Sequence, residues 1–238
     1  MIEAHWLEQA EADVPRDNTW LSARELDRLN RIRFAKRCDD WRLGRWTAKC
    51  GVAASLNLPT GSESLARIEV RPAASGAPEV LIANMSAAVI ISLSHRDGRA
   101  LCALASPGVE LGCDLEIIEP RSHEFVADYF TPEEQARIAQ ASPTERPRLL
   151  ALLWSAKESA LKALQEGLRL DTRSVSVSSI DMSLVVNGWS TLEVCCVDGR
   201  VFRGWWQQTK NMVRTLVANP PTVSPILLSV PAYLPCRA

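Results

Sequence analysis

The chain has 238 residues, of which 47% are hydrophobic and 23% charged, and its formal net charge is −1. A chain of this size and composition is an ordinary globular protein with one large domain or two small ones. Its near-neutral charge argues against a general electrostatic attraction to nucleic acid or to an anionic membrane, so neither is expected as a partner.

The cysteines and the apolar runs bear on the compartment. The seven cysteines are odd in number, scattered and without C-x-x-C spacing, which is typical of reduced thiols in a cytosolic protein. The sequence begins with an acidic segment rather than the basic one of a signal peptide, and its longest apolar run, "AAVIISL" from Ala87, is far too short to span a bilayer. We therefore expect a cytoplasmic protein.

In the first half of the sequence, helices precede antiparallel strands. After a short strand at about residues 4–7, Ser22 and Glu25 form a capping box that begins helical territory extending to about Leu56. An Asp97-Gly98 turn predicts a hairpin that ends in "RALCALA". Strands are expected before that turn at 66–70, 78–83 and 88–94.

The second half repeats this order. A turn at Ser106 leads into the strand "VELGCDLEII", and Thr131-Pro132-Glu133-Glu134 is a good helix start. Asp198-Gly199 predicts a second hairpin, and the segment from Pro220 is expected to be a partly ordered tail. Helices are expected within 123–140 and 145–167, and strands at 174–180, 183–187, 190–197, 200–208 and 212–218.

A short sequence echo accompanies the repeated order. "WTAK" at 46–49 recurs as "WSAK" at 154–157, and each is followed by an Ala/Leu-rich helix and a β-branched strand. We interpret this as an internal duplication. It predicts an α+β fold of two pseudo-symmetric lobes, residues 1–105 and 106–238, each with helices packed on a small antiparallel sheet, and a cleft between the lobes as the place for a ligand.

Three acidic residues are candidate metal ligands. Asp114 and Glu116 lie in "GCDLE" and point to the same face of the expected strand, where two carboxylates repel each other unless a cation sits between them. Taken alone, they are more simply the exposed face of a strand whose other face is core. Glu158, an acid on an otherwise apolar helix, adds a third carboxylate, and three oxygen ligands suit Mg²⁺ and phosphoryl transfer.

The basic candidates have two interpretations each. Lys157 and Lys162 face phosphates bound at the carboxylates, or they form a surface charge pairing with Glu158 worth some tenths of a kcal/mol. Ser94 and His95 end a strand just before a tight turn, although a lone His there is more often structural. The basic segment 24–49 is a solvated helix face or holds an anionic ligand. Neither a Walker loop nor a Rossmann fingerprint is present.

These motifs together resemble a known family. "GCDLE" followed by "WSAKESALK", with "SLSHRDG" ahead and "GLRLD" behind, resembles the 4'-phosphopantetheinyl transferases. The length and the first lobe resemble the larger, monomeric, two-lobed type that activates nonribosomal peptide and polyketide synthases, rather than the small trimeric carrier-protein synthases. The resemblance spans roughly residues 31–177.

The resemblance implies a reaction and a site. A serine of an apo acyl or peptidyl carrier protein would receive the phosphopantetheine arm of coenzyme A, with release of adenosine 3',5'-bisphosphate. Asp114, Glu116 and Glu158 would hold Mg²⁺, Lys162 would neutralise a phosphate, and Glu158 or a bound water would take the serine proton. The residues expected to bind the coenzyme are Arg42, Arg45, Lys49, Ser94, His95, Lys157 and Lys162.

Two departures from the family pattern concern the details. The family's G-K-P is Gly76-Ala77-Pro78 here, so a lysine near the nucleotide is missing, and Arg71 or Arg96 is a candidate substitute. Cys113 replaces the usual Ile or Val of the strand motif, a role that a buried thiol can fill. The rival hypothesis is a non-enzymatic relative that binds a coenzyme or an acidic partner through the basic segment 24–49, and the presence of all three acids disfavours it.

Overall fold

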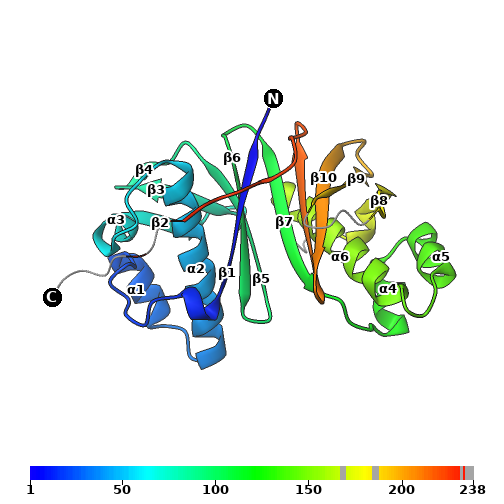
Figure 1. Ribbon diagram of the computed structural model, residues 1–238, viewed down its shortest axis with the longest axis horizontal. Coiled ribbons are helices and arrows are strands. Elements are labelled where there is room, and N and C mark those ends of the chain that lie inside the picture. The colour runs from blue at the N-terminus through cyan, green and yellow to red at the C-terminus, as the bar shows by residue number, and fades with distance from the viewer. Residues whose placement is uncertain (167–169, 184–187, 231–232, 234–238) are drawn as a thin grey trace. The chain divides into compact units, whose positions relative to one another are not determined.

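A computed structural model describes the chain except for residues 167–169, 184–187, 231–232 and 234–238 (Figure 1). The chain forms two compact units. Unit 1 comprises Met1–Glu3 and Val109–Pro225, and unit 2 comprises Ala4–Gly108 and Ile226–Ala238. Met1–Glu3 thus belong to the unit formed mainly by the second half of the chain, and Ile226–Ala238 belong to the unit formed mainly by the first half. Most of the strand expected at 183–187 lies outside the described residues.

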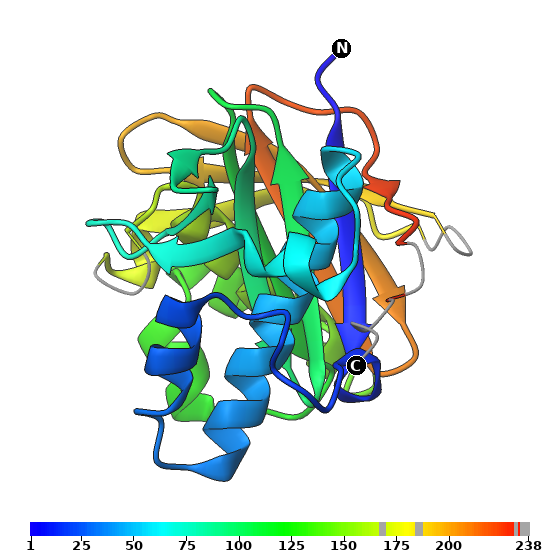
Figure 2. The same cartoon turned by 90° about the vertical axis from the view of Figure 1, so that its left-hand side faces the viewer.

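Unit 2 is built on a four-stranded sheet in the order β12-β1-β6-β5. Its longest helix, α2 (Ala35–Ser55), packs against β1 and β6 (Figure 2). The strands of this sheet are β1 (Ala4–Ala10), β5 (Ile90–Arg96), β6 (Arg99–Ala105) and β12 (Ile226–Leu227). The other elements are the 3₁₀ turn η1 (Glu11–Asp13), α1 (Ala23–Leu29), α3 (Ser62–Ala66), and a second sheet of β2 (Ile68–Pro72), β3 (Pro78–Ile82) and β4 (Met85–Ser86).

The hairpin between β5 and β6 forms as predicted. Asp97 and Gly98 both have positive φ, +50° and +69°, which matches the right-handed twist of the strands they join. The hairpin therefore places Ser94 and His95 near the end of β5, with Ser94 opposite Leu101 and His95 opposite Ala100.

The helical territory predicted from Ser22 to Leu56 consists of two helices. Ser22 and Glu25 form the expected capping box at the start of α1, but α1 ends at Leu29 and α2 begins only at Ala35. Because of this break, α1 packs back against α2, and Glu25 forms an ion pair with Lys49.

The proline-rich segment from Pro220, predicted as a partly ordered tail, contains a short strand. Ile226 and Leu227 form β12, which pairs in parallel with β1 at His5 and Trp6. The amide of Leu228 also donates to the carbonyl of Trp6 at 2.9 Å. Residues 226–228 thus complete one edge of the unit 2 sheet.

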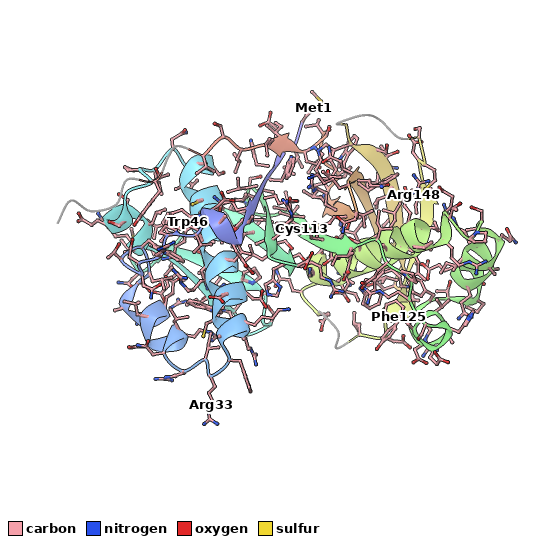
Figure 3. All side chains as sticks on the ribbon, turned by 60° about the horizontal axis from the view of Figure 1, so that its bottom comes forward. Met1, Arg33, Trp46, Cys113, Phe125 and Arg148 are labelled. Carbon is pink, nitrogen blue, oxygen red and sulfur yellow. The ribbon has the colours of Figure 1, made fainter. Side chains whose placement is uncertain are left out.

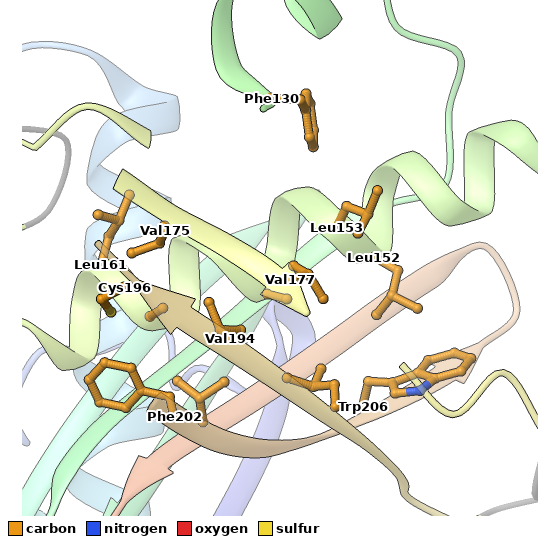
Figure 4. Packing of buried hydrophobic residues seen from close by; sticks show 14 of the residues in the cluster. Phe130, Leu152, Leu153, Leu161, Val175, Val177, Val194, Cys196, Phe202 and Trp206 are labelled. Carbon is orange, nitrogen blue, oxygen red and sulfur yellow. The ribbon is translucent and has the colours of Figure 1, made fainter. Parts of the chain in front are cut away.

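Unit 1 has one antiparallel sheet in the order β7-β11-β10-β9-β8. Its longest helix, α6 (Arg146–Ala163), packs across β7 and β11. Side chains of α6 and of the strands form the core of the unit, including Leu152, Leu161, Val194 and Trp206 (Figure 4). Its remaining elements are β7 (Glu110–Ile117), α4 (His123–Tyr129), α5 (Pro132–Gln140), η3 (Thr172–Ser174), β8 (Val175–Ile180), β9 (Ser190–Cys196), β10 (Val201–Thr209) and β11 (Met212–Asn219).

The two units share one chain order. In each, a first strand is followed by helices, the longest helix and then further strands, and the last strand of the series returns to pair with the first: β6 with β1, and β11 with β7. In each, the longest helix packs on that pair of strands. The predicted α+β fold, with helices packed on small antiparallel sheets, is confirmed. Among the described residues, no helix is long and apolar enough to cross a membrane.

Candidate functional site

Strand β7 presents its acids to helix α6. Gly112, Asp114 and Glu116 alternate along the strand and therefore share one face. Gly112 has no side chain to hold the helix away: a Cβ there would lie 1.8 Å from the carbonyl oxygen of Ser159. The backbone of α6 thus approaches β7 directly beside the acids.

A buried hydroxyl cluster fixes α6 on the sheet. Thr215 of β11 lies opposite Asp114 in the ladder, and its hydroxyl is 2.9 Å from that of Ser155 and 2.7 Å from that of Ser159. All three residues are buried. The bonds set the rotation of α6, and with it the direction in which Glu158 points.

Lys162 bridges the helix and the strand. Its ammonium donates to Asp114 Oδ1 at 2.7 Å and to the carbonyl of Cys113 at 3.1 Å. Burial lowers the pKa of Lys162, but Asp114 outweighs this effect and the net pKa is raised. Lys162 is therefore a firmly protonated cation, and its side chain is still 26% exposed.

Glu158 is a half-buried acid with a raised pKa. Burial, and next the charge of Asp114, raise its pKa to about 7. Its Oε1 is buried and has no hydrogen-bond partner among the described residues. A nearby cation therefore stabilises the ionised form of this carboxylate.

The donor chemistry fits Mg²⁺. The three acids offer only oxygen, and Mg²⁺ is commonly held by one or two carboxylates together with waters and substrate phosphates. Among the described residues, however, no group of three or more Asp, Glu, His or Cys side chains is placed so that it could already hold a metal ion. Lys162 already neutralises Asp114, and Arg121 pairs with Glu116.

Arg121 was not found by sequence reasoning. It lies in the loop between β7 and α4, and its Nη2 is 3.1 Å from Glu116 Oε2 and 3.0 Å from Glu119 Oε1. Its guanidinium also lies over the ring of Phe125, 5.2 Å from the centroid. The only sequence signal was a basic residue shortly after the acidic strand.

Lys157 does not face the acids. It is fully buried, and its ammonium donates to Glu134 Oε2 at 2.6 Å. Glu134 is the capping-box acid of α5: Oε2 also accepts from the amide of Thr131, and Oε1 accepts from the amide of Val177 on β8 at 2.9 Å. The expected surface pairing with Glu158 is therefore wrong, and the ammonium is enclosed in the core.

Lys49 repeats this arrangement in unit 2. It too is fully buried, and its ammonium lies 2.5 Å from Glu25 Oε2, the capping-box acid of α1. Glu25 Oε1 accepts from the amide of Val70 on β2. Lys49 also donates to the carbonyls of Trp20 and Leu65, so all three of its ammonium hydrogens have acceptors. The lysines of "WTAK" and "WSAK" are equivalent core groups, and neither is presented to a coenzyme.

The other predicted coenzyme contacts lie in unit 2. Arg42 is bonded to Asn18 and to the backbone carbonyl of Pro15, and Arg45 is 4.0 Å from Glu25 with only 13% of its side chain exposed. Both arginines therefore have internal partners. His95 is exposed and Ser94 is half-buried. Their contact with a coenzyme stays a prediction.

An arginine-lined cavity of about 770 Å³ occupies another part of unit 2. Glu69, Phe34 and Trp41 also line it, and so does Arg71, the candidate substitute for the missing G-K-P lysine. Figure 3 shows Arg33 extending away from the rest of the unit. The cavity is on the basic segment for which sequence reasoning left open a solvated face or an anionic ligand. Its arginines are Arg24, Arg28, Arg31, Arg33, Arg37 and Arg71.

Comparison with known families identifies the segment that carries the acids. Residues 110–196 match the model of the 4'-phosphopantetheinyl transferase superfamily. For this segment the predicted superfamily is confirmed, and the larger two-lobed type stays a prediction.

Two relatives match over similar lengths. One is a Synechocystis protein provisionally described as a 4'-phosphopantetheinyl transferase, 32% identical over 79 residues. The other is a 4'-phosphopantetheinyl transferase of Bacillus subtilis, 30% identical over 86 residues. The matches cover 32% and 36% of this chain and 32% and 38% of the relatives, so the chain spans only about a third of the length of each.

Among solved structures, a holo-(acyl-carrier-protein) synthase of Bacillus anthracis in complex with CoA (3',5'-ADP) aligns with 44% of this chain and 96% of its own. The sequence identity is 21% and the TM-score 0.38. A likeness of this degree carries no inference about function.

Proposed function

We propose that this protein transfers the 4'-phosphopantetheine arm of coenzyme A to a serine of an apo acyl or peptidyl carrier protein. The observation that carries the proposal is the arrangement of Asp114, Glu116, Glu158 and Lys162 on β7 and α6, within the segment that matches the superfamily. The names of the matched relatives agree with it.

In the proposed reaction, the serine oxygen bonds to the phosphorus that carries the pantetheine arm. The bond from that phosphorus to the bridging oxygen breaks, and adenosine 3',5'-bisphosphate leaves. Lys162, protonated and partly exposed, neutralises charge on the phosphates. Asp114, Glu116 and Glu158 would hold a bound Mg²⁺, which would supply Lewis-acid stabilisation of the pyrophosphate.

Glu158 is our proposed acceptor of the serine proton. A pKa of about 7 makes the carboxylate a stronger base than an ordinary glutamate and leaves much of it ionised at neutral pH. A bound cation lowers that pKa, so a water held by Glu158 serves as the acceptor if the carboxylate is fully engaged by metal.

The test is transfer itself. Purified protein with MgCl₂, coenzyme A and an apo carrier should yield a carrier heavier by one phosphopantetheine, measured by intact mass. Glu158→Gln should reduce the rate at least about 100-fold, as expected for loss of a proton acceptor, while circular dichroism stays unchanged. A fully active variant would refute the role of Glu158, and no mass gain on carriers from fatty-acid, polyketide and peptide synthases would refute the function.

Several finer properties are part of the proposal. These are dependence on Mg²⁺, the larger two-lobed subtype acting as a monomer, and service to fatty-acid, polyketide or nonribosomal-peptide synthesis. The cysteines in the described part of the chain are free thiols, which supports the cytoplasm as the compartment. A non-enzymatic binder remains the rival, and the mass assay separates the two.

A further inference from the structure

Arg121 connects an acid of the candidate site to an aromatic cluster. Its Nη2 contacts Glu116 Oε2 at 3.1 Å, and its guanidinium lies over Phe125. The side chain is only 24% exposed, and that of Glu116 only 12%. The contact is thus largely shielded from water, where an ion pair is stronger and better defined than on an open surface.

The cluster ties Arg121 to the helix that carries Glu158. The ring of Phe125 is 5.0 Å from that of Trp154 and 4.9 Å from that of Tyr129, both tilted or edge-on. Trp154 is four residues before Glu158 on α6, so the two side chains lie on the same side of the helix. Packing against α6 therefore fixes the position from which Arg121 reaches Glu116.

We propose that Arg121 is a positioning residue, which holds the carboxylate of Glu116 in the orientation needed to bind a divalent cation. The inference rests on the proposed function, because it concerns the same three acids. Carboxylates that bind metals are themselves commonly held by hydrogen bonds from a surrounding group, and loss of that group costs about 10–100-fold in metal affinity.

Positioning and simple electrostatics predict opposite results. Arg121 is a cation beside an acidic group, and by Coulomb's law its removal should strengthen the binding of any other cation. If Arg121 orients Glu116, its removal should instead weaken that binding. The direction of the change in affinity therefore decides between the two effects.

The experiment measures Mn²⁺ binding to the full chain by electron paramagnetic resonance of free Mn²⁺, with coenzyme A present. Arg121→Met keeps the apolar stem over Phe125 and removes the guanidinium, and we expect at least about 10-fold weaker binding. Arg121→Lys should recover part of the loss. The matched control is Arg200→Met, since Arg200 pairs with Glu110 on the same strand, at 3.4 Å. It should bind Mn²⁺ as the wild type does.

Kinetics give a second measurement. For Arg121→Met, the Mg²⁺ concentration at half-maximal transfer should rise about 10-fold, with kcat at saturating Mg²⁺ nearly unchanged. Unchanged or tighter Mn²⁺ binding by Arg121→Met overturns the inference and leaves the proposed function standing. A wild type that binds no Mn²⁺ with coenzyme A overturns the metal site and the inference together. If the Met variant does not fold, Arg121→Lys is measured in its place: Mn²⁺ binding weaker than that of the wild type supports the inference, and unchanged or tighter binding overturns it.

Discussion

The buried pair of Lys157 and Glu134 gives a sharp prediction for stability. In Lys157→Met, the carboxylate of Glu134 stays in the core without its counter-ion, although the amides of Thr131 and Val177 still donate to it. Removing one partner of a buried pair typically costs about 3–5 kcal/mol. Because the two amide bonds remain, we expect a loss near the lower end, about 3 kcal/mol, in the free energy of unfolding of unit 1.

Urea denaturation measures that loss, and hydrogen exchange with mass spectrometry locates it. Protection should fall in unit 1 and remain unchanged in unit 2. Glu134→Gln combined with Lys157→Met removes both charges, so the double variant should be more stable than Lys157→Met alone. Lys36→Met, at an exposed lysine of α2, serves as the control and should change the stability by less than about 0.5 kcal/mol.

The equivalent pair in unit 2, Lys49 and Glu25, allows the same experiment to be repeated in the other unit. Lys49→Met should reproduce the loss, but in unit 2, because Glu25 makes the same kind of backbone contacts as Glu134. If Lys157→Met stays within about 1 kcal/mol of the wild type, the reasoning about the buried charge is refuted.

Two further predictions concern Glu158 and the close approach of α6 to Gly112. In metal-free protein with EDTA, the pKa of Glu158 is about 7, above the value of about 4.3 for an unfolded chain, so its contribution to stability is full below pH 4 and is lost as the pH rises through 7. The free energy of unfolding of Glu158→Gln should thus equal that of the wild type at pH 4. At pH 8 it should be higher by about 1–2 kcal/mol, after allowance for solvent screening at this half-buried side chain. Chemical denaturation across this pH range measures the difference, and equal stability at pH 8 contradicts the prediction. Gly112→Ala puts a methyl group 1.8 Å from the Ser159 carbonyl, so α6 must shift by more than about 1 Å, which should cost about 1–3 kcal/mol and slow transfer about 100-fold. Thermal denaturation and the mass assay measure both effects, and an unperturbed variant would show that the close approach is not needed.

The elements that carry the candidate site were predictable because their patterns are local. Alternation along β7 placed Asp114 and Glu116 on one face, and helical spacing placed Glu158 with Lys162 on α6. The turn at Asp97 was equally clear, since a two-residue hairpin needs residues that accept positive φ.

The partners of these side chains were less predictable, because they depend on tertiary packing. Lys157 and Glu134 are 23 residues apart and meet only once α5 packs on α6. Glu134 was recognised as part of a helix start, but an acid in that position can also form an ion pair, and its spacing does not reveal this. Arg121 contacts Glu116 through a loop without periodicity, so no pattern pointed to it.

Strand β12 makes the unit 2 sheet depend on two segments that are far apart in the sequence. It covers an edge of β1, yet it consists of residues 226 and 227. A chain growing on the ribosome leaves that edge of β1 open until all of residues 109–225, nearly the whole of unit 1, have been made. An open edge strand is a template for pairing with another chain. Synthesis is therefore the period in which unit 2 is most exposed to aggregation, and a chain shortened before Ile226 would keep that exposure permanently.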